Sequence, residues 1–561
     1  MTVREVDDWK LSSPSLAPVQ TDTDWTEESI SDTGQQRPEE LRSLWHEIGF
    51  TFSIAMSQIL TQEYFVSGFT VILPGLVQGH IIPESSSVWP ASMFSLAVAS
   101  TTLIFGRLAD MYGGRRIYIC GTVWLAIWSL VIGFVKNEIL LNLSRAFQGI
   151  GASAMLPSGL MLMGSLYRPG TRKNMVFSIY GACAPFGFFV GILVAGAAGG
   201  LATWSYYFWV GAALTVFTSI IAYFTVPGYR RRAVKTIQQK VQTEAQSIGR
   251  DNDEREQQDD DIVMDWVGGG ILFLSLNLLV VALIASSQAP NGWRTSYVYV
   301  CFILGISSLL ATICVERWIA KCPLIPPSFL CRTQMPALLL SLFLFYGSLS
   351  IFLLHASQYM EQSMGASTIQ TVAWYAPMAA GGCIISIFGG YVLHLLSGTI
   401  LLIIAGSAWV IAPLLFAIAP SGANYWAYIF PSMLCATIGI DITFNVCNIF
   451  ITTSTPYNQQ GFAGAVVAFL LHFGGTICLA MAGVVKRKTQ SSLGERKSCQ
   501  AVFWLEVGCA TIATIILVAF VRIGEAKSDF TVEEKSEQNN KLQSDTTLEE
   551  KLGTESQISD S

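Results

Sequence analysis

Long apolar runs alternate with short polar segments along almost the whole chain. A membrane-crossing helix needs about 20 mostly apolar residues. Several runs are also rich in Gly and Ala, which is typical of membrane helices that pack closely on one another. The pattern predicts an all-α polytopic membrane protein with fourteen transmembrane helices, near residues 46–70, 88–106, 117–135, 138–163, 174–197, 204–226, 263–286, 297–316, 336–357, 368–391, 400–418, 425–450, 461–485 and 500–522.

Polar segments divide these runs into larger units. Both ends of the chain are polar and poor in aromatic residues, which predicts disordered cytoplasmic tails at 1–44 and, more acidic, at 524–561. A charged cytoplasmic linker at 228–262 separates six runs from the eight that follow. We therefore expect two six-helix bundles, at 45–227 and 336–523, with two additional helices and a loop at 263–335 between them. Parallel repeats of this kind are a transporter architecture.

The distribution of basic residues predicts the orientation. With the N-terminus inside, the loop at 107–116 and the segment "YRRRAVK" (229–235) lie on the inner side, where Lys and Arg gather. The basic segment 486–498 disagrees, because it is a loop on the outer side if all fourteen helices cross the membrane.

Composition excludes several classes of protein. The chain is 52% hydrophobic and 13% charged, with a mean hydropathy of +0.48, whereas soluble proteins are about a quarter charged. The net charge of −6 comes mostly from acids in the tails and gives no reason to expect a nucleic-acid partner. The twelve cysteines are scattered and only five histidines occur, so neither a disulfide framework nor a metal site is predicted. Without a P-loop, a nucleophile elbow or a converging set of acids and bases, an enzyme is not expected.

Asp441 is the most informative single residue, because it lies in the middle of the twelfth run. Thr437, Asn445 and Asn448 lie at i−4, i+4 and i+7, which places all four on one helical stripe. A polar stripe on an apolar span is expected to line water rather than lipid. A poorly solvated carboxylate there can load and release protons near neutral pH. The alternative is a structural acid hydrogen-bonded to a neighbouring helix.

Two further polar positions lie inside apolar runs. Arg145, followed by Gln148, must face a cavity or a partner, because a charge in a membrane helix costs about 2.5–3.5 kcal/mol even on insertion scales. The alternative is an arginine that reaches the outer interface. Glu63, beside Gln62, gives the first helix a polar segment. The alternative is that Glu63 only adds polarity to the helix packing or contacts substrate without carrying a proton. We expect Asp441, with Arg145 across the cavity and Glu63 as a possible partner, to form the coupling site.

The stretch "FGRLADMYGGRR" (105–116) interrupts two apolar runs. Gly106 and Gly113 permit the tight turns of a short inner hairpin, and Asp110 can pair with Arg115 or with a helix end. The alternative is a plain inner turn whose basic residues only set the orientation.

Several motifs together resemble the major facilitator superfamily. Gly106, Asp110, Gly113, Arg115 and Arg116 match its signature loop, and "LSRAFQGIGASAMLP" (143–157) matches its helix-four motif with an intramembrane arginine. The stretch "GACAPFGFFVGILVAG" (181–196) lies where the helix-five antiporter motif is expected, and 439–465 is similar to fungal aminotriazole-resistance transporters. The chain most resembles the fourteen-helix drug:proton antiporters of fungi. In the helix-five stretch the usual Gly-Pro pair is missing: Gly191 is followed by Ile192, and the proline is Pro185, near Gly187.

The resemblance implies the major facilitator fold and proton-coupled efflux of small organic toxicants, drugs or secondary metabolites by alternating access. It implies that no cofactor is needed, because the proton gradient supplies the energy. The implied partners are a small-molecule substrate, protons and lipid, and the implied oligomeric state is a monomer. It also implies a multi-pass location in the plasma membrane or, alternatively, the vacuolar membrane. The signature loop is expected to close the cytoplasmic side. Because the Gly-Pro pair is missing, an uptake carrier or facilitator for a nutrient or siderophore remains the alternative.

Overall fold

The computed structural model describes residues 37–523, except 39, 80, 84–87, 168–170, 202, 229–263, 290–291, 321, 333 and 456–458. This part of the chain is helical and contains no β-strand, so the predicted all-α class is confirmed. Helices suit the composition because a backbone in lipid must satisfy its own hydrogen bonds. Of the tails predicted at 1–44 and 524–561 and the linker predicted at 228–262, residues 1–36, 39, 229–262 and 524–561 lie outside the described residues.

The first half of the chain contributes six rods. The first is a composite of three consecutive elements, α2 (Leu44–Gln58), the π-helical η1 (Ile59–Tyr64) and α3 (Phe65–Gln78). The Ser43 hydroxyl caps α2 by accepting the His46 N–H at 3.2 Å. The remaining rods are α4 (Val88–Tyr112), α5 (Gly114–Ile132), α6 (Glu138–Leu166), α7 (Thr171–Leu201) and α8 (Ser205–Thr225).

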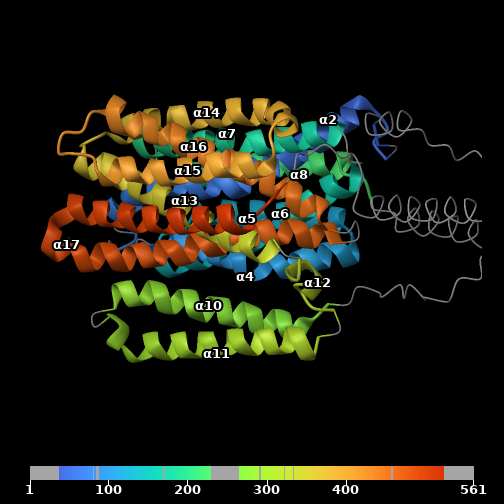
Figure 1. The fold of residues 1–561 in the computed structure, drawn as a ribbon, viewed down its shortest axis with the longest axis horizontal. Coiled ribbons are helices and arrows are strands. Elements are labelled where there is room, and N and C mark those ends of the chain that lie inside the picture. Colours follow the sequence, from blue (N-terminus) through green and yellow to red (C-terminus); the bar gives the residue numbers. More distant parts are fainter. Residues whose placement is uncertain are drawn as a thin grey trace, which may run out of the picture.

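The second half follows the same plan. It consists of α13 (Met335–Gln358) with η4 (Tyr359–Ser363), α14 (Thr368–Leu395), α15 (Gly398–Ala417), η5 (Tyr425–Ile429) with α16 (Phe430–Thr453), and α17 (Gln460–Phe520). Between the halves, α10 (Trp266–Gln288) and α11 (Ser296–Trp318) pair with each other, and α10 packs on α4 and α17. Figure 1 shows this pair along one side of the molecule. The remaining short elements are η3 (Gly292–Arg294) and α12 (Pro327–Leu330).

One predicted loop has a different structure. Residues 486–498 are not an extended connection but the middle of α17, which is interrupted only at Gly494 (φ 77°, ψ 171°). Two arms, 460–493 and 495–520, therefore fold back on each other at a residue type that tolerates a positive φ. Lys486 pairs with Glu495 at 3.2 Å, and Arg496 donates to the Ala419 carbonyl oxygen at 2.6 Å. Part of the positive charge is thus neutralised locally at the end where α15 leads into α16.

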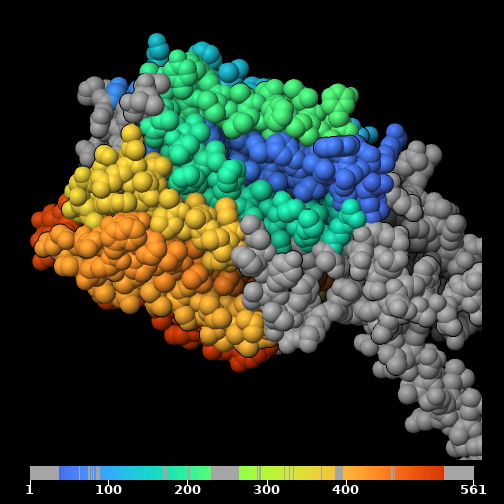
Figure 2. Space-filling view, turned by 90° about the horizontal axis from the view of Figure 1, so that it is seen from above, coloured from blue at the N-terminus to red at the C-terminus, as the bar shows by residue number. Residues whose placement is uncertain are grey.

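Eleven helices of the described part are long and apolar enough to cross a membrane. The halves meet mainly where α7 packs on α14 and where α17 packs on α4 and α6. Figure 2 shows the first half (blue to green) and the second half (yellow to red) as two bodies side by side. Residues at these two seams are therefore the ones that a movement between the halves would rearrange.

Candidate functional site

Asp441 lies where α7, α14 and α16 meet. Its side chain is 4% exposed, and the Thr437 hydroxyl donates to its Oδ2 at 2.7 Å. Gly382 of α14 makes this approach possible, because a Cβ placed there would lie 2.7 Å from the same oxygen and would also collide with Pro185 of α7. Asp441 and Pro185, the proline of the helix-five motif, thus both pack on Gly382 at the contact between the two halves.

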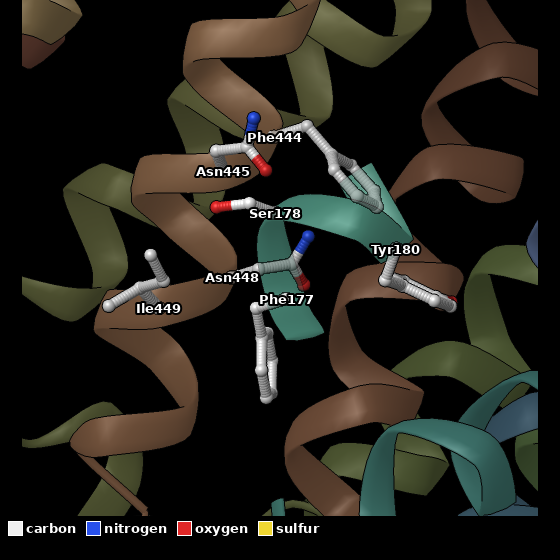
Figure 3. A pocket seen from close by; sticks show the side chains of 7 residues that line it. All are labelled: Phe177, Ser178, Tyr180, Phe444, Asn445, Asn448 and Ile449. Atoms are coloured by element: carbon white, nitrogen blue, oxygen red, sulfur yellow. The ribbon is translucent and has the colours of Figure 1, made fainter. Parts of the chain in front are cut away.

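The predicted stripe continues along α16 against α7. Asn445 faces Gly181, four residues before Pro185, so the two helices run in opposite directions along this contact. Figure 3 shows Asn445 and Asn448 beside a small cavity together with Ser178. Its volume of about 10 Å³ suffices for roughly one water molecule. Asn448 is 3% exposed, and neither atom of its amide has a hydrogen-bond partner in the described part of the chain.

Aromatic side chains close this end of the seam. Phe177, Tyr180 and Phe444 also line the cavity, and the rings of Tyr180 and Phe444 stack with centroids 6.5 Å apart. The sequence predicts a polar stripe, but it could not predict that Asn445 and Asn448 pack beside Phe177 and Tyr180 of the first half.

Arg145 is buried (1% exposed) and does not reach an interface. Its guanidinium donates to the Gln148 Oε1 at 2.7 Å, to the Phe65 carbonyl oxygen at 3.0 Å and to the Pro90 carbonyl oxygen at 3.2 Å. These contacts have no residue in common with those of Asp441. The arrangement expected from the sequence, Arg145 facing Asp441, is not what the described contacts show, because backbone carbonyl groups occupy the donors of the arginine.

Two aromatic rings hold the same guanidinium. Its carbon lies 4.5 Å from the centre of the Phe69 ring and 4.7 Å from that of Phe94. Phe94 also contacts His472 of α17 edge-on, with ring centres 6.1 Å apart. Arg145 is therefore connected to the other half of the molecule through one phenylalanine, a link that no charge pattern in the sequence could reveal.

Gln62 and Glu63 belong to the π-helical η1, and their side chains lie outside what the structure describes. π-helical turns inside longer helices are frequent at functional sites. The neighbouring Tyr64 and Tyr207 rings stack in parallel, with centres 4.7 Å apart. Gly191, of the helix-five motif, packs directly on this turn, since a Cβ there would lie 2.9 Å from the Tyr64 Cα. Gly187 lies buried between Pro185 and Gly191 on the same helix.

The signature loop contacts the other half through its acid. Asp110 accepts the backbone N–H of Gly461 at 2.9 Å and that of Phe462 at 3.1 Å, and these residues begin α17. A carboxylate at a helix N-terminus is favourable because the free N–H groups and the helix dipole point toward it. Of the two predicted options, the helix end is therefore confirmed. Gly106 is not part of a turn; it lies inside α4, where a Cβ would come 2.9 Å from the Gly461 carbonyl oxygen.

Gly113 and Arg115 of this loop act within the first half. Gly113 makes the turn, with φ at 90°. Arg115 donates to the Tyr223 carbonyl oxygen at 2.8 Å rather than to Asp110, so the predicted pairing of the two is wrong. Arg116 is exposed.

Sequence reasoning missed a second contact of this loop. Arg107 is 4% exposed and donates to the Pro323 carbonyl oxygen at 2.6 Å, in the segment that follows α11. The loop therefore holds the additional helix pair as well as α17. Arg107 stands three residues before Asp110 in the same motif, but the partner is a backbone group and leaves no signal in the sequence.

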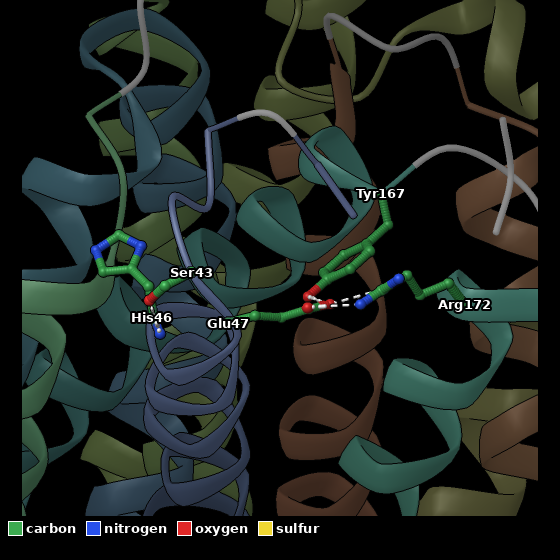
Figure 4. Close-up of polar contacts among 5 residues, drawn as sticks. All are labelled: Ser43, His46, Glu47, Tyr167 and Arg172. Carbon is green, nitrogen blue, oxygen red and sulfur yellow. Dashed lines mark hydrogen bonds and ion pairs between the residues drawn. The ribbon is translucent and has the colours of Figure 1, made fainter. Parts of the chain in front are cut away.

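A partly buried ion pair at the start of α2 was also missed. The Glu47 carboxylate accepts from the Arg172 Nε at 2.8 Å and Nη2 at 2.7 Å, and from the Tyr167 hydroxyl at 3.2 Å (Figure 4). Hydrogen bonding to Glu47 raises the pKa of Arg172. An acid in the first turn of an apolar run, and a base just before another, were the available signals.

Next to this pair lies a groove of about 770 Å³ between α2 and α7. Its walls are mostly apolar, and Glu47 and Arg172 are its charged residues. They include Phe52, Met56 and Ile59 of the first rod and Ile179 and Phe186 of α7. Sites for small organic molecules typically enclose about 300–1,000 Å³ with this mixture of apolar surface and few polar groups.

Within the described residues, no group of three or more His, Cys, Asp or Glu side chains could hold a metal ion.

The family model of the Major Facilitator Superfamily matches residues 50–478. The chain belongs to the major facilitator superfamily. The resemblance inferred from the signature loop and helix four is thereby confirmed, and the protein is a multi-pass membrane transporter rather than an enzyme.

Relatives of this superfamily member include three fungal transporters. The low affinity ammonium transporter of Saccharomyces cerevisiae is 29% identical, over 90% of this chain and 93% of its own. The efflux pump terJ of Aspergillus terreus is 28% identical, over 91% of this chain and 93% of its own. The aminotriazole resistance protein of S. cerevisiae is 27% identical, over 88% of this chain and 87% of its own. The predicted fungal drug-transporter branch is confirmed.

Solved structures share the fold at low sequence identity. The proton:xylose symporter XylE, bound to 6-bromo-6-deoxy-D-glucose, aligns with a TM-score of 0.57 at 14% identity, covering 87% of this chain and 98% of its own. The human organic anion transporter MFSD10 aligns with a TM-score of 0.55 at 13% identity, covering 84% and 99%. These matches show that the arrangement of helices is that of the superfamily.

Proposed function

We propose that this transporter is a proton-coupled efflux pump that exports small organic toxicants, drugs or secondary metabolites by alternating access. The observation that carries the proposal is Asp441, a buried acid at the seam between the halves, with Gly382 and Pro185 packed around it. An intramembrane carboxylate is costly and is best explained by function. The names of two relatives, an efflux pump and a resistance protein, support export.

The proposed topology has fourteen crossings. To the eleven long apolar helices it adds the composite rod 44–78, α14, and the second arm of α17. Along the chain, the two six-helix bundles, 45–227 and 336–523, then stand before and after the additional pair α10 and α11. We place the protein in the plasma membrane as a monomer with both tails inside.

In this mechanism Asp441 carries the coupled proton. Its accessibility changes when α7 and α16, which belong to different halves, separate along the stripe. Thr437, Asn445 and Asn448 would line the opened route, with Gln62 and Gln148 on the facing half and Glu63 as a further candidate acid. Arg145 has a positioning role: its hydrogen bonds to three oxygens hold the first rod, α4 and α6 together. No cofactor is required, because the proton gradient supplies the energy.

The cytoplasmic gate is the contact of Asp110 with α17. Gly106 and Gly113 let the loop approach, and Arg115 and Arg116 provide positive charge on the inner side. Because Asp110 caps a helix of the other half, the contact can exist only while the cytoplasmic side is closed.

The substrate class follows from the groove between α2 and α7. Its volume and apolar walls suit an apolar or amphipathic organic compound rather than a sugar, which would require many hydrogen-bonding groups. Its position beside the π-helical η1 places any occupant next to the segment that carries Glu63.

A second candidate function is uptake of a small solute by the same fold. The similarity to an ammonium transporter favours it, as does the missing Gly-Pro pair at Gly191. Expression in a sensitive yeast host separates the two. Export lowers the cellular content of aminotriazole or another toxicant and restores growth, whereas uptake raises the content of the probe, with ammonium tested in parallel.

The deciding experiment is Asp441→Asn in proteoliposomes with an imposed pH gradient, using a compound that the growth assay identifies. Asparagine keeps the size and hydrogen bonding but cannot titrate, so the variant should bind the compound and lose uphill transport. Asp265→Asn is the matched control, because Asp265 caps α10 by accepting the Gly268 N–H at 2.9 Å. Uphill transport by Asp441→Asn at the parental rate across a range of pH would refute the role of Asp441.

A further inference from the structure

A second intramembrane acid lies far from the stripe of Asp441. Glu506 is in the second arm of α17, within the apolar sequence "VFWLEVGCATIATIILV" (502–518). It is 0% exposed, and within the described part of the chain neither oxygen of its carboxyl group has a hydrogen-bond partner. Buried polar atoms are nearly always paired, so an exception requires an explanation.

Parts of α13 and of both arms of α17 pack together next to this carboxyl group. Ile351 of α13, Cys478 and Ala482 of the first arm of α17, and Val502 of the second arm form one buried apolar cluster. The titratable groups next to Glu506 are the thiols of Cys478 and of Cys509, which contact each other. No basic group of the described residues pairs with it.

Apart from Glu506, the charged residues of α17 all lie between Lys486 and Lys497, around the turn at Gly494. There His355 of α13 faces Lys486, and Lys486 is already engaged by Glu495 at 3.2 Å and by the Gln358 Oε1 at 2.9 Å. The apolar layer of Ile351, Ala482 and Val502 lies between this group and Glu506 along the helices. Glu506 therefore has no cation within reach that could compensate a negative charge.

The energetic comparison favours the neutral acid. Burying an ionised carboxylate without a partner costs several kcal/mol, whereas a buried neutral hydroxyl or carbonyl without a hydrogen bond costs about 1–3 kcal/mol. A purely structural role would be served better by an apolar side chain, since the carboxyl group forms no contact that stabilises it.

We infer that Glu506 is a proton-binding site of the second half, separate from Asp441, and that it holds its proton while the cytoplasmic gate is closed. The site is connected to the gate through one helix: the first arm of α17 receives Asp110 at Gly461 and packs beside Glu506 at Cys478. A movement of that arm on opening changes the surroundings of both carboxyl groups. Glu506 then exchanges its proton when this movement admits water.

Infrared difference spectroscopy of the full-length protein in liposomes tests the inference directly. A protonated carboxyl group has a carbonyl stretching band that an ionised one lacks. Comparing acid with alkaline samples, the parent should show one component that is absent from Glu506→Gln and still present in Asp441→Asn. Glu495→Gln, at the exposed turn of α17 beside Gly494, is the matched control and should leave this component unchanged. The readout does not depend on transport, so it is independent of the proposed function.

A second variant covers the case in which Glu506→Gln fails to fold. Cys509→Ser places a hydroxyl group beside the carboxyl group, and a hydrogen bond from it should shift the band to lower frequency. Loss of the component in Glu506→Gln, or its shift in Cys509→Ser, supports the inference. A spectrum that neither substitution alters overturns it, because Glu506 would then carry no proton in the folded protein.

Discussion

Asp110→Asn tests how strongly the cytoplasmic gate is held. The carboxylate accepts two backbone N–H groups at the start of α17, at 2.9 and 3.1 Å. Hydrogen bonds to a charged group contribute about 1.5–3 kcal/mol and neutral ones about 0.5–1.5 kcal/mol, and a charge at a helix N-terminus adds about 0.3–1 kcal/mol. Asparagine retains one acceptor but no charge, so the closed state should lose about 2–3 kcal/mol. That corresponds to a shift of about 30- to 150-fold toward the open state.

Hydrogen exchange measured by mass spectrometry gives this quantity without labels. The amides of Gly461 and Phe462 are protected by Asp110 itself, so their exchange rates should rise by about the same factor as the open population. Peptides from α10 should exchange as in the parent. Glu138→Gln is the matched control, because Glu138 also stands in the first turn of a helix but does not contact α17. Unchanged exchange at Gly461 and Phe462 in Asp110→Asn would refute the gate reasoning.

Three further predictions follow. Gly382→Ala should reduce transport at least tenfold with little loss of protein, because the new Cβ collides with Pro185 and displaces Asp441. The control Gly199→Ala on α7, with open space around it, should transport normally, and equal rates in the two variants would contradict the packing described. Glu47→Gln should lower the free energy of unfolding by about 1–3 kcal/mol, seen as a lower melting temperature in detergent, because Arg172 loses a bidentate partner; an unchanged melting temperature would mean that the pair is not stabilising. A cysteine introduced at Ala245, in the linker predicted to be cytoplasmic, should resist impermeant thiol reagents in intact cells and react after permeabilisation, and labelling from outside would reverse the topology.

Much of the fold was available from the sequence because the bilayer limits the choices. A chain that must bury its backbone hydrogen bonds in lipid forms helices of a nearly fixed length, so apolar runs such as 138–163 correspond closely to helices such as α6 (Glu138–Leu166). The helical period likewise placed Thr437 and Asp441 on one face, and the structure has them hydrogen-bonded at 2.7 Å. Periodicity within one helix is local information, and the sequence contains it.

Only the tertiary structure decided which groups meet across helices. The partners of Asp110 are backbone N–H groups more than 350 positions away, and any sequence at that helix start would provide them. Arg145 was expected to face an acid, but its donors go to two carbonyl oxygens and a glutamine, which periodicity cannot specify. Glu506 interrupts an apolar run in the sequence, and only the packing of the helices shows that its carboxyl group has no partner among the described residues. A sequence determines which face of a helix is polar, because that depends on residues a few positions apart; what the face meets depends on how helices distant in sequence pack together.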